Sequence, residues 1–211
     1  MMTRAPEKKI GRLRHSWLYG GTLWIGSLLC AAGPSLAIEV NPSEVQVQTA
    51  LERGYVAAQA VTSPARLYAW FGPPAEQLKS HGFLMTKMAG LRVLGTHFAL
   101  RGEKPSQEEV RQIVEGTSLL VTVMVFGSRP DLALDAYAVL EQGGKSIKPV
   151  TVRFDAIAPR SLVWPDQPAY RGKVVASFAY TDFDPKAMTK LSIFPAAGGE
   201  IAFDLNFAEI E

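Results

Sequence analysis

The feature that most constrains the fold is a series of short apolar segments, separated by Gly, Pro and Asp, that runs from residue 118 to the C-terminus. In the last of them, 200–207, every second residue is large and apolar: Ile201, Phe203, Leu205 and Phe207. A period of two places these side chains on one face of a strand, and predicts that Asp204 faces solvent. Many short strands joined by turns favour an antiparallel β-sandwich or open barrel over a doubly wound fold.

Five further strands are expected in this half of the chain, at 119–126, 133–141, 147–154, 173–180 and 189–194. The first is apolar throughout, which is typical of a central strand buried on both faces. The pairs Gly143-Gly144 and Gly198-Gly199 each predict a hairpin turn.

The front half of the chain predicts helices as well as strands. Asn41 as cap, Pro42 and Glu44 indicate a helix start, and a stripe of apolar residues continues to Val61. Ser106 and Glu109 have the spacing of a capping box. Strands are expected at 67–71, 83–87 and 91–100, with one helical turn at 75–80.

These patterns predict a mainly β, α+β fold. It is an antiparallel sandwich or open barrel, immunoglobulin-like in general architecture, with an N-terminal helix at about 42–62 and a short helix at about 106–115. Residues 38–211 are interpreted as a single β-rich domain, because no flexible linker divides them. A subdivision near residue 116 is the alternative, with a mixed front and an all-β back.

The first 37 residues have the layout of a secretory signal peptide. A basic stretch ends at Arg14, an uncharged apolar run covers 17–29, and the small residues Ser35 and Ala37 follow Gly33-Pro34. This order predicts export and cleavage near Ala37, which would leave a periplasmic or extracellular domain. The alternatives are a retained N-terminal membrane anchor and a lipoprotein acylated at Cys30.

Loss of this segment would narrow the possible chemistry. Cys30 is the single cysteine, so residues 38–211 can form no disulfide, thiol nucleophile or cysteine-ligated metal site. They contain 17 basic and 19 acidic residues, which argues against nucleic acid as a partner. No apolar run in them is long enough to span a membrane. The sequence indicates no cofactor.

Motifs of common enzymes are absent from the sequence. There is no G-x-S-x-G, H-E-x-x-H or phosphate-binding loop, and His81 and His97 lack the spacing of a metal pair. Paired carboxylates could still meet in space, and nothing in the sequence selects them. No motif resembles that of a known family.

Two weaker patterns are candidates for a site. Flat aromatic rings on a sandwich surface can stack on sugars or bind a protein, and four residues fit this role: Tyr68, Trp70, Trp164 and Tyr170. The alternative is that these rings close the core. Oxygen ligands for a calcium-like cation could come from Asp182, Asp184 and Asp204, although Asp184-Pro185 is also an ordinary turn.

The sequence therefore favours an exported, envelope-associated, non-enzymatic domain that binds or supports another macromolecule, either a protein or a polysaccharide of the cell envelope. The alternative is a hydrolase that acts on envelope polymers with acidic residues that the sequence does not identify. Two buried carboxylates in a cleft would favour the hydrolase. An exposed apolar patch on a sandwich would favour the binding domain.

Overall fold

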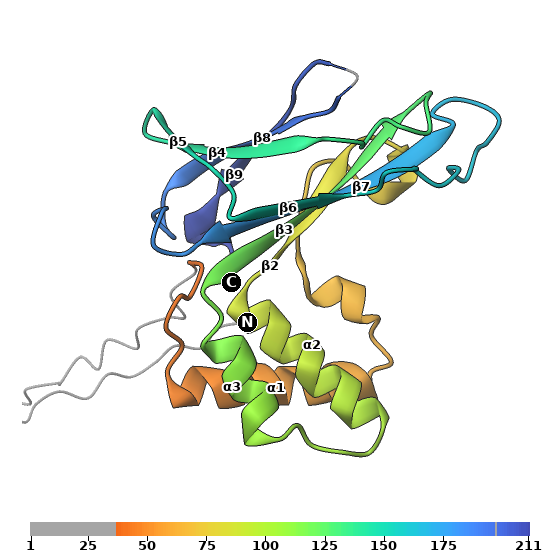
Figure 1. Cartoon of the computed structure of the whole chain (residues 1–211). Coiled ribbons are helices and arrows are strands. Elements are labelled where there is room, and N and C mark those ends of the chain that lie inside the picture. Colours follow the sequence, from red (N-terminus) through yellow and green to blue (C-terminus); the bar gives the residue numbers. More distant parts are fainter. Residues whose placement is uncertain (1–36, 197) are drawn as a thin grey trace, which may run out of the picture. The chain divides into compact units, whose positions relative to one another are not determined.

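The long apolar segment that starts at Ser118 forms β3 (Ser118–Gly127), the central strand of a five-stranded sheet (Figure 1). The structure is a computed structural model and describes residues 37–196 and 198–211. In this sheet the strand order is β1-β2-β3-β7-β6, with the bounds β1 (Ala69–Phe71), β2 (His81–Met85), β6 (Thr151–Phe154) and β7 (Tyr170–Ala179). Every pairing is antiparallel.

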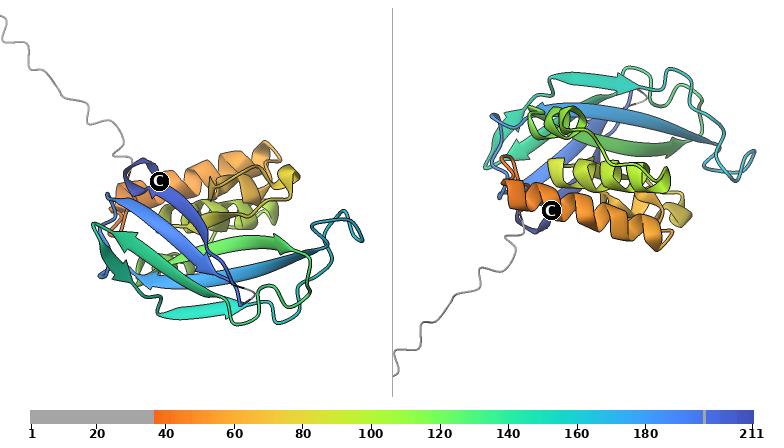
Figure 2. Two further views of the ribbon diagram at one scale, coloured as in Figure 1. Left: turned by 90° about the horizontal axis from the view of Figure 1, so that it is seen from above. Right: turned by 90° about the horizontal axis from the view of Figure 1, so that it is seen from below.

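A second, four-stranded sheet lies over the first (Figures 1 and 2). Its order is β5-β4-β8-β9, with the bounds β4 (Tyr137–Gln142), β5 (Lys145–Ile147), β8 (Met188–Phe194) and β9 (Ile201–Asn206). A short 3₁₀ helix, η3 (Phe207–Glu209), follows β9. Gly143 and Gly144 have positive φ angles in the turn between β4 and β5, as the hairpin prediction requires.

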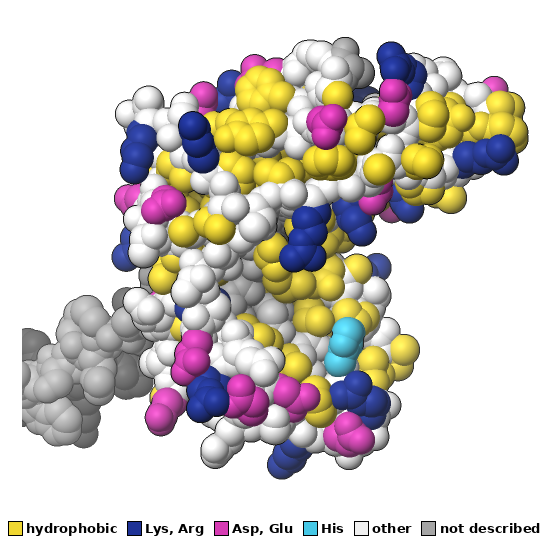
Figure 3. Space-filling model, in the orientation of Figure 1, with side chains coloured by type: hydrophobic (Ala, Val, Ile, Leu, Met, Phe, Trp, Pro, Cys, Tyr) yellow, Lys and Arg dark blue, Asp and Glu magenta, His cyan; other side chains and the backbone are white. Residues whose placement is uncertain are grey.

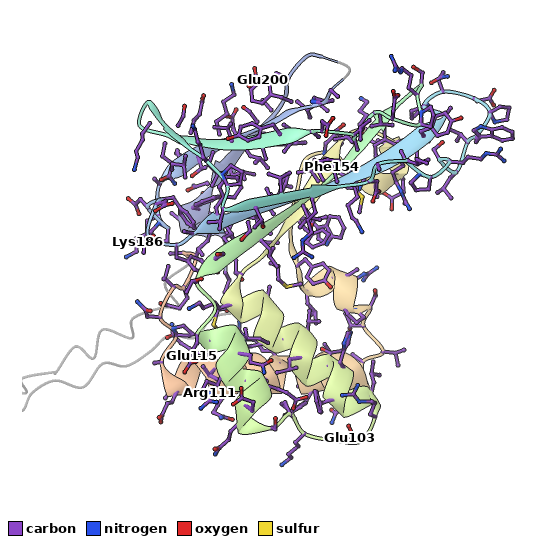
Figure 4. All side chains as sticks on the ribbon, viewed as in Figure 1. Glu103, Arg111, Glu115, Phe154, Lys186 and Glu200 are labelled. Carbon is purple, nitrogen blue, oxygen red and sulfur yellow. The ribbon has the colours of Figure 1, made fainter. Side chains whose placement is uncertain are left out.

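The main core fills the space between the two sheets (Figure 4). Its fully buried side chains come from both sheets and include Val121, Val125, Phe178, Leu140 and Leu191. The alternation predicted for the last strand is confirmed. Leu205 and Phe207 are buried, Ile201 and Phe203 pack against the core, and Asp204 is exposed.

The prediction that β3 is buried on both faces is wrong. Its burial alternates, so that Leu119, Val121, Val123 and Val125 face the core, whereas Leu120 on the opposite face is 43% exposed. The helical layer leaves part of this outer face uncovered, and Figure 3 shows a hollow between the sandwich and the helices.

Three helices form a separate layer on the outer side of the five-stranded sheet (Figure 1). They are α1 (Glu44–Gln59), α2 (Lys87–Leu100) and α3 (Gln107–Val114). A second core holds them together, with the buried side chains Val47, Ala50, Leu51, Met88 and Leu91. Two 3₁₀ turns, η1 (Pro64–Leu67) and η2 (Ala75–Gln77), flank β1.

Both predicted helices are confirmed, with one change of cap. The capping box at Ser106 and Glu109 is present as expected. The first helix is capped by Ser43 and not by Asn41. The Ser43 side chain accepts from the Gln46 amide, and the Gln46 side chain accepts from the Ser43 amide, which completes a capping box.

The strand expected at 91–100 is wrong, because this segment belongs to α2. Thr86 caps the helix, and its hydroxyl accepts a hydrogen bond from the Ala89 amide. Gly90 and Gly95 both lie within α2. They are the points at which α2 approaches its neighbours, since a Cβ on Gly90 would contact Ile113 and a Cβ on Gly95 would contact the Leu51 backbone.

The single strand expected at 147–154 is two strands. β5 ends at Ile147 in one sheet, and β6 begins at Thr151 in the other. Pro149 lies in the connection between the two strands, and it has no amide hydrogen to donate to a neighbouring strand.

The fold is therefore a mainly β, α+β sandwich with a helical layer, in agreement with the predicted class. The immunoglobulin-like part of the prediction is not confirmed. The described residues, 37–196 and 198–211, lie in one compact unit. The predicted signal segment, including Cys30, lies outside the described residues except for Ala37. Within the part of the chain that the structure describes, no helix has both the length and the apolar character of a membrane span.

Candidate functional site

The outer face of the five-stranded sheet carries a row of rings from three strands. Register places Trp70 of β1 opposite Phe83 of β2, and His81 of β2 opposite Met124 of β3. Paired residues share a face of a sheet, so these side chains all point away from the sandwich core. Phe126, two residues beyond Met124 on β3, lies on the same face.

These rings are in mutual contact. Tyr68 stacks on Phe83 with ring centres 4.5 Å apart, and Trp70 lies 5.1 Å from Phe83. His81 continues the row, 6.0 Å from Trp70 and 5.7 Å from Phe126. We call these five residues, Tyr68, Trp70, His81, Phe83 and Phe126, the aromatic face. Ring pairs at such spacings attract one another beyond the burial of their area, so the row is a stable feature of the surface.

A glycine fixes the first strand in its place beside the aromatic face. Gly82 points inward between His81 and Phe83, and a Cβ there would lie 2.4 Å from the Phe71 ring and 2.4 Å from the Thr122 carbonyl oxygen. The ring of Phe71 therefore occupies the space that a side chain would need. This packing holds β1 against β2 and presents Trp70 on the opposite side.

Trp70 is held by a hydrogen bond and is nevertheless accessible. Its indole Nε1 donates to the Ala65 carbonyl oxygen at 2.6 Å, while 48% of the residue surface is exposed. A rigid, half-exposed indole loses little conformational entropy when a ligand binds, which makes it a good anchor.

A pocket of about 230 Å³ opens at the Phe126 end of the aromatic face. Its wall consists of residues in and just after η2, the rings of His81 and Phe126, the Leu162 side chain, and two basic side chains, Arg160 and Arg171. Arg171 also lines a neighbouring hollow with Met124, Asp155 and Lys173. The two hollows share Arg171, and we call them together the trough, which runs from the rings of His81 and Phe126 to the basic side chains.

His81 is buried beneath this pocket. It is 5% exposed, and its Nδ1 lies 2.8 Å from the Lys79 carbonyl oxygen. A carbonyl oxygen can only accept, so Nδ1 carries the proton of this hydrogen bond. The ring is thereby fixed in one orientation.

The basic end of the trough has no acidic partners within the described chain. Arg153, Arg160, Arg171 and Lys173 are exposed, and none of them forms an ion pair with a described acidic side chain. The Arg160 guanidinium instead lies 3.8 Å from the centre of the Trp164 ring, a cation–π contact. Figure 3 shows basic side chains beside hydrophobic ones along this edge of the hollow.

The four aromatic residues proposed from the sequence do not form one platform. Tyr68 and Trp70 lie together on the aromatic face, with ring centres 6.4 Å apart. Trp164 is on the loop between β6 and β7, where its ring contacts Arg160, a residue that lines the trough. Tyr170 lies partly buried against the sandwich core, because its position on β7 points inward.

The three carboxylates proposed as cation ligands have separate partners. Asp182 Oδ1 accepts from the Thr181 hydroxyl, and Asp184 Oδ1 accepts from the Lys186 amide. Asp204 is paired in the ladder with Lys190, on another part of the four-stranded sheet. In residues 37–196 and 198–211, no group of three His, Cys, Asp or Glu side chains is placed to hold a metal ion.

Phe83, His81 and Phe126 are the residues of the aromatic face that sequence reasoning missed. Each alternates with a core residue on its strand, and this alternation was the available signal for an outward position. Arg160 and Arg171 were missed because they come from a loop and a strand far from β2 in sequence.

Two buried ionisable residues, Lys87 at the start of α2 and Tyr180 just after β7, are in contact. Burial lowers the pKa of Lys87, against a smaller opposite effect of Glu39, and its Nζ lies 5.3 Å from the centre of the Tyr180 ring. Burial raises the pKa of Tyr180 to about 12. The Tyr180 hydroxyl has no hydrogen-bond partner among the described residues.

Comparison with known proteins adds no family to this description. No model of a protein family matches the chain, and a search of curated proteins finds no match. One solved structure with a limited likeness is the archaellum periplasmic stator protein complex FlaF and FlaG from Sulfolobus acidocaldarius. It covers 42% of this chain and 77% of the matched chain, at 7% identity and a TM-score of 0.26.

Proposed function

We propose that this protein is an exported, envelope-associated domain without catalytic activity, which binds another macromolecule through the aromatic face and the basic end of its trough. The observation that carries this proposal is the continuous row of five rings that leads from Tyr68 to a pocket with two arginines. Rigid rings next to unpaired guanidinium groups are typical of binding surfaces.

The shape of the trough suits an extended ligand better than a small molecule. It consists of two hollows that share Arg171, and its aromatic part, His81 and Phe126, lies on strands that are themselves held by the sandwich core. A polymer segment with apolar or flat groups at one end and an acidic group at the other would match it. Both a protein and a polysaccharide of the envelope can meet this requirement.

Export is supported by the sequence of the first 37 residues, with its basic stretch, apolar run and small residues before Ile38. An exported domain with no cysteine after Cys30 must rely on its packed core, and the core between the two sheets is extensive.

No specific observation favours the hydrolase. Every acidic side chain in the described ranges is exposed or half-buried. The 230 Å³ pocket is lined by one acidic residue, Glu76, and the neighbouring hollow by Asp155. A pair of carboxylates flanking one cleft is what glycoside chemistry would need.

The test is capture from a native envelope fraction by immobilised wild-type protein and its Trp70→Ala variant, with retained proteins identified by mass spectrometry and retained sugars by composition analysis. We expect one class of ligand to be retained by the wild type and reduced at least about tenfold by Trp70→Ala, as for an interface anchor. Thermal melting of both proteins should show that Trp70→Ala remains folded.

Tyr137→Ala is the matched control. Tyr137 is also aromatic and is 41% exposed, but it lies on the outer face of the four-stranded sheet. Capture that is unchanged in Trp70→Ala, or reduced equally by Tyr137→Ala, would contradict the assignment to the aromatic face. An Arg171→Gln variant that binds like wild type would remove the basic end of the trough from the site.

A further inference from the structure

The loop between β6 and β7 presents large apolar side chains to solvent. Leu162 is 91% exposed, Ile157 is 80% exposed and Trp164 is 43% exposed. Figures 1 and 2 show that this loop extends beyond the strands at one end of the sandwich. Single exposed apolar residues are common, but three on one projecting loop indicate a surface for interaction.

The loop is held rigidly at its base. Ala158 is buried, and its amide donates to the Pro130 carbonyl at 2.6 Å. The Ser161 amide donates to the Ala169 carbonyl at 2.8 Å, and the Arg171 amide donates to the Pro159 carbonyl at 3.0 Å. Because these bonds already order the loop, its apolar side chains can enter a new environment with little loss of conformational entropy.

The surroundings of the loop are basic. Arg153 and Lys173 lie on the neighbouring strands, Arg171 follows the loop, and Arg160 belongs to it and stacks on Trp164. Three acids share this region, and one of them, Glu76 of η2, lines the pocket with Arg160 and Arg171. Asp155 is directed to the backbone, where its Oδ2 accepts from the Lys173 amide at 2.9 Å, and Asp166 is exposed. Four cations without ion pairs to described acids thus outnumber three carboxylates.

We propose that the loop 155–169 is a docking element for an anionic lipid surface, with Ile157, Leu162 and Trp164 inserted at the headgroup level and the four cations on the phosphates. An apolar tip and a basic surround are the two signals that stable, reversible membrane attachment requires. Tryptophan is favoured at this depth, because its ring is apolar and its N–H polar. This attachment is additional to macromolecule binding by the aromatic face. It shares Arg160, Arg171 and Lys173 with the basic end of the trough, but it does not use the rings of the aromatic face.

The decisive measurement follows residue 162 directly. In a Cys30→Ser background, Leu162→Cys is labelled with an environment-sensitive fluorophore and mixed with phosphatidylcholine vesicles, with or without phosphatidylglycerol. We expect a blue shift with the anionic vesicles, and a much smaller one with phosphatidylcholine alone. The same label at Val61→Cys is the matched control, since Val61 is 85% exposed on the helical layer, and it should show no shift.

The charge contribution is tested with Arg153→Gln and Lys173→Gln in the labelled Leu162→Cys protein. Each lost cation should weaken vesicle binding about fivefold, and added salt should weaken it further. Trp70→Ala should leave the shift at position 162 unchanged. The proposal is overturned if the label at 162 reports no change with anionic vesicles, or if the label at 61 changes equally. In that case the aromatic face could still bind its macromolecule.

Discussion

Gly54 of α1 and Gly95 of α2 meet where the two helices cross, with backbone against backbone. A Cβ on Gly54 would lie 2.3 Å from the Arg92 carbonyl oxygen, and a Cβ on Gly95 would lie 2.6 Å from the Leu51 carbonyl oxygen. The Thr96 hydroxyl donates to the Gly54 carbonyl at 2.9 Å across the same crossing. This close approach fixes the helical layer, which borders the hollow beside the aromatic face.

Gly54→Ala and Gly95→Ala should each destabilise the protein by about 1–3 kcal/mol, because the added methyl group overlaps backbone atoms that cannot move aside alone. Gly90→Ala on α2 is the control. Its Cβ would lie 3.3 Å from a side-chain methyl of Ile113, so the gain in helix propensity should make it neutral or stabilising. Urea unfolding measures the difference, and equal losses at Gly90 and Gly95 would refute the close crossing.

Phe207→Ala should cost about 3–5 kcal/mol of unfolding free energy, because its ring is fully buried in the main core. Asp204→Ala should cost about 0.5 kcal/mol or less, since this residue is exposed. Melting curves of the two variants test the register of the last strand. A large effect of Asp204→Ala would show that its carboxylate has a role that the described contacts do not contain.

Tyr180→Phe should maintain or raise stability by about 1 kcal/mol, because it removes a buried hydroxyl without a hydrogen-bond partner in the described structure. The variant should also change how the stability of the fold declines at alkaline pH. The folded pKa is raised from 10.0 to about 12, so the folded state binds this proton more tightly than the unfolded state. The stability that this linkage contributes is complete below pH 10 and is lost as the pH rises toward 12.

That loss amounts to about 3 kcal/mol for a shift of this size. Urea unfolding of wild type and Tyr180→Phe across this pH range should therefore show a steeper decline in the wild type. Lys87 is retained in both proteins, so its own titration largely cancels in the comparison. Parallel curves would mean that Tyr180 ionises normally in the folded protein.

Cleavage after Ala37 should occur before the domain folds. Ala37 is 8% exposed and Ile38 is 2% exposed, and the Ile38 amide donates to the Pro185 carbonyl at 3.3 Å. A peptidase needs this segment extended and accessible, and folding buries it. N-terminal sequencing of exported protein should begin at Ile38, whereas the folded full-length chain should resist the peptidase.

Two results would revise the expected processing. Full-length protein recovered from the membrane fraction would indicate a retained anchor. A diacylglyceryl group on Cys30 would indicate a lipoprotein.

The aromatic face shows how far sequence reasoning reached toward the candidate site. Tyr68 and Trp70 were found because they are two residues apart and both aromatic. The sequence could not predict that Phe126 belongs to the same site, because its contact with His81 depends on the pairing of β2 with β3. The inward position of Tyr170 likewise follows from the register of β7 with β3, which no local pattern specifies.

Local physics determined those parts of the fold whose signal lies within a few residues. The Ser106 capping box, the glycine hairpin after β4 and the alternation of 201–207 each depend on neighbouring side chains or on backbone freedom, and each is present in the structure. The helix at 87–100 and the division of 147–154 between two sheets were decided only by tertiary structure. Gly95 packs against the Leu51 backbone of α1, and the contacts that stabilise such a segment come from residues distant in the chain.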